Sequence, residues 1–275
     1  MQEAYMVPRG GRTRREGELE RRDIRPLEGC QEVMLLTYTG PASGLARLYS
    51  NALMELKGTF APVLRPEEVS QRYLPFSEGG GRATVFGLGD PSSTLRVLEA
   101  LKVAGYEVEL FRPPLKGLPY ELEGKLSAYP AREVPPDLLQ ALVEVGSTVL
   151  REALEGSDNP RAARIKEDLE DLEIPLTLNL DIDMIIYTNS MEMAAQALSY
   201  VTKAPALYYQ EALGAELRNK KIVILTTSSE EHWVRGMAVR MRAGLVSLPY
   251  DPLVAPLSFV ASLRKVIAYT RADNL

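Results

Sequence analysis

A cluster of three hydroxyl side chains, Ser92, Ser93 and Thr94, follows a short apolar run in the first half of the chain. The run Ala83–Phe86 predicts a buried strand, and the leucines after the cluster recur at helical spacing. The hydroxyls would therefore lie at a helix N-terminus, where unpaired backbone N–H groups and roughly half a positive charge favour an anion such as phosphate. The same residue types are equally typical of a helix N-cap, so both interpretations stay open.

The residues around this cluster have the order strand, loop, helix, strand. The loop Gly87–Pro91 precedes the hydroxyls, and a second β-rich run, Tyr106–Phe111, follows the helix. This is the unit from which parallel sheets are built, and such sheets bind ligands beyond the carboxyl ends of their strands. The loop contains neither GxxxxGK[ST] nor GxGxxG. A nucleotide-binding enzyme is therefore the least supported of the α/β functions.

The same order of elements occurs in both halves of the chain. A strand at Val33–Thr37 leads into a Gly/Ser loop, and a strand at Asp183–Tyr187 leads into Asn189 and Ser190. Later in the second half, the strand Lys221–Thr226 is followed by another hydroxyl-rich loop and a helix. The pattern predicts an α/β protein with two parallel, five-stranded sheets in tandem, each covered by helices on both faces.

These patterns divide the sequence into three segments. Residues 1–29 are dense in Arg and Glu and are expected to form a charged N-terminal arm, while residues 30–158 and 159–275 are expected to form the two α/β domains. Residues 112–136 are rich in proline and glycine and are expected to be irregular. The basic run Arg12–Arg15 is interpreted as a solvated segment paired with the neighbouring glutamates, or else as a phosphate or RNA contact.

Two tandem halves with a Gly/Ser loop after the first strand and a Ser/Thr loop after the third resemble the sugar isomerase (SIS) fold. The pattern is most similar to the short archaeal bifunctional phosphoglucose/phosphomannose isomerases, from about Val33 to the C-terminus. The resemblance rests on order and spacing more than on identical motifs. It implies two SIS-like αβα subdomains, a sugar phosphate or similar small anion as ligand, no cofactor and no metal.

The resemblance also implies a set of binding residues. The family's first loop, GMGGSG, is matched here by Gly40, Ser43 and Gly44, with Pro41 in place of one glycine. Its phosphate loop, SxSGNT, is matched by the hydroxyls of Ser92, Ser93 and Thr94 without the full motif, and Asp90 adds a carboxylate beside them. The family's arginine before the helix that closes the first half is matched by Arg132, which is otherwise interpreted as a solvent-facing loop residue.

The catalytic groups of the family are not found at the matching positions. Its glutamate run is replaced by residues 199–203, which contain no carboxylate, and Glu211 is the titratable group nearest to the position of its histidine. Aldose–ketose isomerisation needs a base that moves a proton between C1 and C2. Glu211 is the candidate for that base, with a surface or dimer contact as the alternative. His232 is expected to be a structural, partly exposed histidine rather than a cleft residue.

Composition limits the remaining possibilities. The net charge of −5 argues against broad capture of nucleic acid, and no apolar run is long enough to cross a bilayer. The N-terminus has no hydrophobic signal-peptide core, so we expect a cytoplasmic protein without a membrane or nucleic-acid partner. The single cysteine, Cys30, excludes an internal disulfide, and the single histidine excludes a His-cluster metal site. Low Asn, Gln and Cys beside abundant Glu and Arg favours a thermophilic source.

Two functions follow from this sequence. The first is a phosphosugar-binding protein of the SIS fold, either a divergent glucose-6-phosphate isomerase-like enzyme or a non-catalytic sensor. The second is a non-catalytic structural, assembly or regulatory protein that keeps the fold as a platform for a homodimer. For that function the apolar residues of the last helix, between Leu253 and Ile267, would build either a core or a subunit contact.

Overall fold

A computed structural model describes residues 34–76, 80–215, 217 and 219–272 of the chain. The predicted charged arm, Cys30 and the Arg12–Arg15 run lie outside these residues. The described elements from Met34 onward belong to one compact unit. They alternate between strands and helices in each half, as the sequence pattern predicts.

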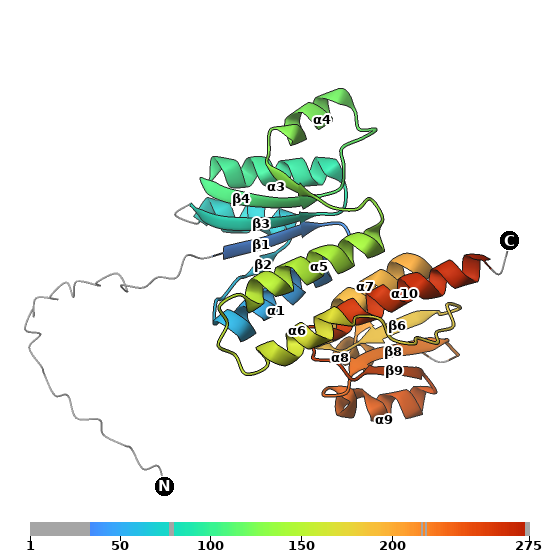
Figure 1. Cartoon of the computed structure of the whole chain (residues 1–275). Coiled ribbons are helices and arrows are strands. Elements are labelled where there is room, and N and C mark those ends of the chain that lie inside the picture. Colours follow the sequence, from blue (N-terminus) through green and yellow to red (C-terminus); the bar gives the residue numbers. More distant parts are fainter. Residues whose placement is uncertain (1–33, 77–79, 216, 218, 273–275) are drawn as a thin grey trace, which may run out of the picture. The chain divides into compact units, whose positions relative to one another are not determined.

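The first half contains a five-stranded parallel sheet in the order β2-β1-β3-β4-β5. Helices α1 and α5 cover one face of this sheet, and α3 and α4 lie over the other (Figure 1). The strands are β1 Met34–Thr39, β2 Val63–Leu64, β3 Gly81–Gly87, β4 Tyr106–Arg112 and β5 Ala131–Glu133. The helices are α1 Ser43–Lys57, α2 Pro66–Glu68, a π-helical turn Val69–Tyr73, a 3₁₀ turn Leu74–Phe76, α3 Pro91–Val103, α4 Tyr120–Ser127 and α5 Leu138–Leu154.

The second half repeats this arrangement with a four-stranded parallel sheet in the order β7-β6-β8-β9. The expected fifth strand is absent from the described residues, because the segment after β9 passes directly into the last helix. The strands are β6 Met184–Tyr187, β7 Ala206–Tyr208, β8 Ile222–Thr227 and β9 Gly244–Leu248. The helices are α6 Ala162–Glu170, a 3₁₀ turn Asn189–Met191, α7 Glu192–Thr202, α8 Tyr209–Ala212, α9 Glu231–Met241 and α10 Ala255–Ala272.

The sequence prediction was wrong in the segment 112–136. Its prolines and glycines indicated an irregular path, but the segment contains the helix α4 and the edge strand β5. Pro119 is the N-cap of α4, and its missing N–H costs no hydrogen bond there because the first N–H groups of a helix have no intrahelical acceptor. Leu126 anchors α4 because its side chain is buried against the outer face of the first sheet.

One hydrophobic core joins the two halves. It combines the inner faces of both sheets with four helices, α1 and α5 from the first half and α7 and α10 from the second. The apolar residues of α10 belong to this core, since Leu257, Phe259, Val260 and Leu263 are fully buried. Those residues are therefore engaged within the chain and do not form a free face for a subunit contact. The predicted boundary at residues 158 and 159 divides two sheets that share a single helical layer.

Within the described part of the chain, no helix combines the length and the apolar character that a bilayer crossing requires.

Candidate functional site

The polar side chains of interest gather at the carboxyl ends of the strands. In each sheet the first and third strands of the half are neighbours, β1 beside β3 and β6 beside β8. The chain leaves these two strands toward opposite sides of the sheet, which makes the gap between their following loops the usual ligand crevice of an open α/β sheet. The site is therefore built from two pairs of loops, one pair in each half.

In the first half, the two loops are in direct backbone contact. Gly40 has a φ of +66°, and a Cβ added to it would lie 2.5 Å from the Cα of Gly89. The backbone N–H of Gly89 donates to Oγ1 of Thr39 at 3.3 Å, and the hydroxyls of Thr39 and Thr94 are 2.8 Å apart. Both glycines are needed because side chains there would separate the loops. The predicted binding residues Gly40 and Thr94 thus hold the two loops together.

The N-terminus of α3 carries its own carboxylate. Asp90 is the N-cap, rather than Ser92 or Ser93, and one of its oxygens accepts from the backbone N–H of Ser93 at 2.7 Å and from its hydroxyl at 2.8 Å. These hydrogen bonds lower the pKa of Asp90. The side chain of Ser92 is exposed. The position that would favour a phosphate therefore already holds a negative charge.

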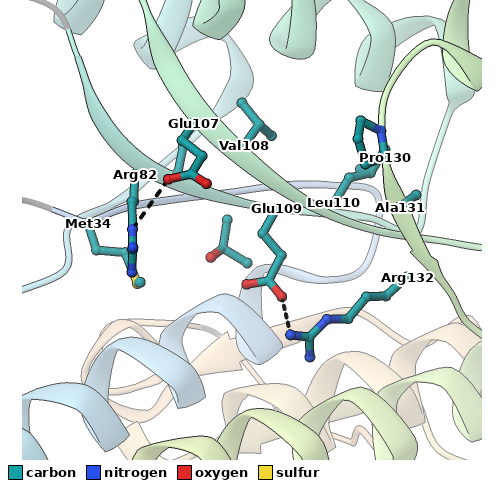
Figure 2. A pocket seen from close by; sticks show the side chains of 11 residues that line it. Met34, Arg82, Glu107, Val108, Glu109, Leu110, Pro130, Ala131 and Arg132 are labelled. Atoms are coloured by element: carbon teal, nitrogen blue, oxygen red, sulfur yellow. Dashed lines mark ion pairs between the residues drawn. The ribbon is translucent and has the colours of Figure 1, made fainter.

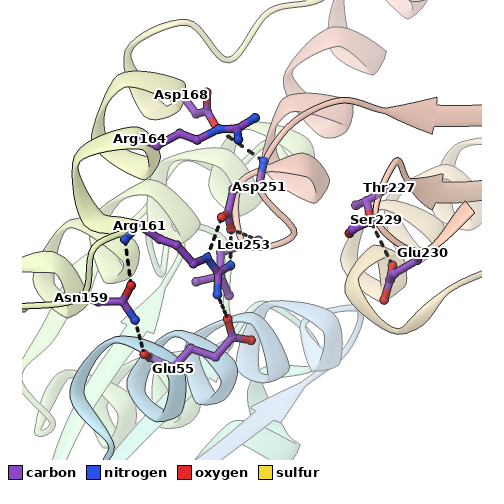
Figure 3. Close-up of polar contacts among 10 residues, drawn as sticks. All are labelled: Glu55, Asn159, Arg161, Arg164, Asp168, Thr227, Ser229, Glu230, Asp251 and Leu253. Atoms are coloured by element: carbon purple, nitrogen blue, oxygen red, sulfur yellow. Dashed lines mark hydrogen bonds and ion pairs between the residues drawn. The ribbon is translucent and has the colours of Figure 1, made fainter.

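In the second half, Glu230 has the corresponding position before α9, but its carboxylate is buried. The side chain accepts from the hydroxyl of Thr188 at 2.6 Å, from that of Thr227 at 3.2 Å and from that of Ser190. The backbone N–H of Ser190 also points at the carboxylate, at 3.4 Å. Glu230 thus occupies a cradle of three hydroxyls and one amide (Figure 3 shows Thr227 and Glu230). Donors of this kind are the ones that bind an oxyanion.

The predicted residues Ser43 and Gly44 lie where the two halves touch. The hydroxyl of Ser43 donates to Glu192 at 3.0 Å, and the backbone N–H of Gly44 donates to the side-chain oxygen of Gln196 at 2.9 Å. A Cβ on Gly44 would overlap the Cα of Met193, so glycine allows α1 and α7 to cross closely. The structure places these two residues in the joint between α1 and α7, 149 or more positions apart in the sequence from their partners.

A polar cavity of about 210 Å³ opens beside this joint and is lined by both halves. Its wall includes one cation, Arg47, whose side chain is 60% exposed and pairs with Glu192 at 3.0 Å. The other lining residues are Gly44, Leu48, Asn51, Glu55, Asn189, Ser190, Glu192, Glu230, Pro252 and Leu253. Amides, hydroxyls, carboxylates and one exposed guanidinium in a single hollow can bind the hydroxyls and the charge of a small polar molecule.

One border of this cavity is fixed by Arg161. Its guanidinium forms two hydrogen bonds with Asp251, at 2.8 and 3.0 Å, and another with Glu55 at 2.6 Å (Figure 3). These bonds to two carboxylates raise the pKa of Arg161. Asn159 ties the same segment to α1 through a bond to the backbone oxygen of Glu55. The segment between the two sheets is thereby held against α1 and against the loop before α10.

Arg132 lies apart from the loops described above. Its guanidinium pairs with Glu109 at 2.8 Å and Glu152 at 2.5 Å, and it lies 5.4 Å from the ring centre of Phe111. It lines a cavity of about 440 Å³ on the inner face of the first sheet, where Arg82 and Glu107 form a second pair (Figure 2). Its charge is offset by two carboxylates, and Ser92–Thr94 do not line this cavity.

The surroundings of that cavity raise the pKa values of two groups, Glu109 and Tyr49. Burial raises the pKa of Glu109, against the opposing effect of Arg132. Burial, together with the charges of Glu152 and Glu109, raises the pKa of Tyr49 to about 12. The pocket is therefore internally neutralised, with each arginine on its wall paired to a glutamate.

Glu211 and His232 are both surface residues of the second half. One oxygen of Glu211 accepts from the backbone N–H of Tyr208 at 3.2 Å, at the start of the short helix α8, and Glu211 does not line the cavity between the halves. His232 is exposed in the first turn of α9, with its ring 5.2 Å from that of Trp233. Among the described residues, no group of His, Cys, Asp and Glu has an arrangement that would hold a metal ion.

Three residues of the site were not singled out from the sequence, namely Arg47, Glu192 and Glu230. A signal for Glu230 was present, because it stands at the N-cap after the third strand of its half, as Asp90 does in the first half. No comparable signal exists for Arg47 and Glu192. Their pairing depends on the crossing of α1 and α7, which only the packing of the two halves determines.

No family model and no curated protein sequence matches this chain. Solved structures do match it. Glucosamine-6-phosphate deaminase from Thermotoga maritima superposes with a TM-score of 0.61 at 12% identity, covering 87% of this chain and 86% of that one. Tagatose-6-phosphate ketose/aldose isomerase from Escherichia coli superposes with a TM-score of 0.52 at 10% identity, covering 85% and 82%.

A third match is a domain of a larger enzyme. The C-terminal domain of glucosamine-fructose-6-phosphate aminotransferase from Francisella tularensis superposes with a TM-score of 0.56 at 12% identity, over 83% of this chain and 80% of that one. At such low identities, the likeness concerns the fold. The chain has the α/β fold of the SIS phosphosugar isomerases, with two parallel sheets in tandem, as the sequence pattern predicted.

Proposed function

We propose that this SIS-fold chain binds a sugar phosphate in the cavity between its two halves. The observation that carries the proposal is the composition of the cavity wall, in which the exposed cation Arg47 is accompanied by amide and hydroxyl groups such as Asn51, Asn189 and Ser190. A guanidinium binds a phosphate through paired N–H donors, while amides and carboxylates bind sugar hydroxyls.

The predicted loop residues take part in this proposal to different degrees. Gly44 lines the cavity, and Ser43 is bonded to Glu192, which also lines it. Phosphate binding by Ser92, Ser93 and Thr94 remains the prediction of the resemblance, although Asp90 now occupies the end of that helix. Arg132 is paired with two glutamates, whereas Arg47 is paired with one, Glu192. Arg47 is therefore the preferred phosphate ligand.

Calorimetric titration with glucose 6-phosphate, glucose and inorganic phosphate tests the proposal. We expect the sugar phosphate to bind more tightly than either of its parts. Arg47→Gln should weaken that binding by about 10- to 100-fold, since a hydrogen bond to a charged group is worth roughly 1.5–3 kcal/mol. Arg240→Gln, on the exposed face of α9, is the matched control and should bind as the parent does. Equal binding by the Arg47 variant, or no binding of any sugar phosphate, would refute the proposal.

Whether the chain also catalyses aldose–ketose isomerisation is tested separately, with the same purified protein. Glu211 is exposed and outside the cavity wall, and its carboxylate accepts from the backbone N–H of Tyr208, the residue before its helix. We therefore propose sugar-phosphate binding as the function and leave isomerase activity to a separate assay. An assay on fructose 6-phosphate and mannose 6-phosphate, with Glu211→Gln beside the parent, decides between the two: turnover that the variant loses would make Glu211 the base, and a parent without turnover would be a sensor.

Three further properties also remain predictions of the sequence: a homodimer, a cytoplasmic location and a thermophilic source organism. The buried face of α10 does not supply the dimer contact. Gel filtration coupled to light scattering measures the oligomeric state directly.

A further inference from the structure

A row of aromatic rings crosses the carboxyl edge of the second sheet. Tyr187 ends β6 and lies 6.0 Å, centre to centre, from Tyr208 at the end of β7. Tyr208 lies 4.8 Å from Tyr209, and Tyr209 lies 5.9 Å from Trp233 with the two rings only 17° from parallel. The row thus joins four separate elements, β6, β7, α8 and α9, and it ends on the first turn of α9.

The outer end of the row is open to solvent. Trp233 is 47% exposed, although tryptophan has the largest apolar surface of any side chain. It is also the single tryptophan of the chain. Stacked aromatic side chains at a surface, rather than in a core, are typical of a place where another molecule packs.

Both ends of the row adjoin residues of the cavity wall. Tyr187 is followed in the chain by the loop that contains Asn189 and Ser190, which line the cavity. The backbone N–H of Trp233 donates to the backbone oxygen of Glu230 at 3.0 Å, and Glu230 lines the cavity as well. Burial, followed by the charge of Glu192, raises the pKa of Tyr187 to about 12.

The polar groups beside the rings determine what kind of molecule fits. The side-chain amide of Gln210 donates to the hydroxyl of Tyr209 at 3.2 Å, and the carboxylate of Glu211 accepts from the backbone N–H of Tyr208 at 3.2 Å. An amide and a carboxylate favour a ligand that carries hydroxyl groups. A pyranose ring presents C–H groups on its face and hydroxyls on its rim, which matches an aromatic surface bordered by acceptors.

We propose that Tyr208, Tyr209 and Trp233 form a second sugar subsite, which takes an uncharged pyranose attached to the sugar phosphate held in the cavity. The inference rests on the proposed function and extends it: the ligand is a phosphorylated disaccharide or glycoside rather than a free hexose phosphate. The phosphorylated ring lies by Arg47, and the second ring packs on Trp233.

Fluorescence and calorimetry test the subsite together. Glucose 6-phosphate and maltose 6′-phosphate share the same phosphorylated ring and differ by one glucose. The disaccharide should bind about three- to tenfold more tightly, as expected for one aromatic contact, and it should change the emission of Trp233 in a saturable manner. Trp233→Ala should abolish the gain in affinity while leaving the affinity for glucose 6-phosphate unchanged. Tyr200→Ala, an equally exposed tyrosine on α7, is the control and should keep the gain.

The outcomes separate the two proposals. If glucose 6-phosphate binds but the disaccharide binds no more tightly and leaves the tryptophan emission unchanged, the subsite is refuted and the cavity proposal stands. If neither ligand binds, the cavity proposal itself fails. If the emission of Trp233 changes with protein concentration in the absence of any sugar, the rings pack against a second copy of this chain, and the subsite is likewise refuted.

Discussion

The two halves of the molecule have an acidic residue at the same place and use it differently. Asp90 and Glu230 each precede the helix that follows the third strand of their half. Asp90 is exposed and bonds only within the first turn of α3. Glu230 is 9% exposed and reaches across to the loop after β6. One fold position therefore serves as a helix cap in one half and as a bridge between two loops in the other.

The loops of the first half are joined by other means. Gly40 and Gly89 let the two backbones touch, and the hydroxyls of Thr39 and Thr94 bond across the contact. In the second half the corresponding loops have side chains, Asn189 and Ser229, so the backbones need another group between them. A carboxylate with several acceptor positions can supply that group. The comparison shows two ways to join the loops of neighbouring strands. Glycines allow direct backbone contact in the first half, and a buried carboxylate with donors from both loops joins them in the second half.

The largest expected effect comes from restoring a side chain to the glycine contact. Gly40→Ala should destabilise the fold by about 4 kcal/mol, because its Cβ would clash with Gly89 and the left-handed backbone disfavours any Cβ. Urea denaturation measures this loss. Gly236→Ala on α9 is the control, since no atom lies within 4 Å of its added Cβ, and it should stabilise the helix slightly. Equal stability of the two variants would mean that the loops are not held by that contact.

The next largest effect is expected at the bridging carboxylate. Glu230→Ala leaves three hydroxyls and a backbone N–H without their acceptor, at a cost of about 3 kcal/mol. Added inorganic phosphate or sulfate should raise the Tm of this variant more than that of the parent, because the vacated cradle offers donors to an oxyanion. Glu231→Ala, one residue along, serves as the control and should respond to phosphate as the parent does. If phosphate or sulfate raises the Tm of Glu230→Ala no more than that of the parent, the cradle does not bind anions.

A matched pair of threonines sharpens the comparison. Thr188→Val removes a hydroxyl that donates to the carboxylate, and should cost about 2 kcal/mol. Thr39→Val removes a hydroxyl whose partners are neutral, and should cost about 1 kcal/mol. Both hydroxyls are buried, so burial does not distinguish them. If thermal or urea unfolding ranks them in the opposite order, the bridge through Glu230 is weaker than its geometry indicates.

The smallest effect is expected at the exposed cap. Asp90→Ala should cost about 1 kcal/mol at pH 7, the usual value for a lost N-cap. The pKa of Asp90 is lowered in the folded protein, so its contribution is present above the ordinary aspartate value of about 4 and is lost as the pH falls below it. The difference in stability between Asp90→Ala and the parent should therefore shrink between pH 5 and about pH 2. A difference that is independent of pH would show that the carboxylate charge plays no part.

The tandem α/β order could be predicted from sequence because it rests on local patterns. The apolar run of β8, the leucines of α3 and the glycines and hydroxyls between elements each mark their own element. The prediction was wrong in the segment 112–136, where prolines and glycines indicated an irregular loop. Pro119 was interpreted as part of a loop, although it precedes the helix α4.

The site was harder to predict, for a physical reason. Ser43 meets its partner Glu192 only when α1 crosses α7, a contact between residues 149 positions apart that no local pattern encodes. The cavity wall, including Arg47, depends on the same crossing. Spacing could place hydroxyls at the start of α3, but it could not show that Asp90 would bond to Ser93 and fill that helix end. Sequence reasoning located the loops and missed the contacts between them.

The helical layer that both sheets share has a consequence for how such a gene can change. Each repeat covers the inner face of its sheet with two helices, and those helices bury their other side against the helices of the opposite repeat. A duplicated or transplanted single repeat would present that apolar side to water, which promotes aggregation. The two halves are therefore expected to fold as one unit, and changes confined to their loops leave the shared interior intact.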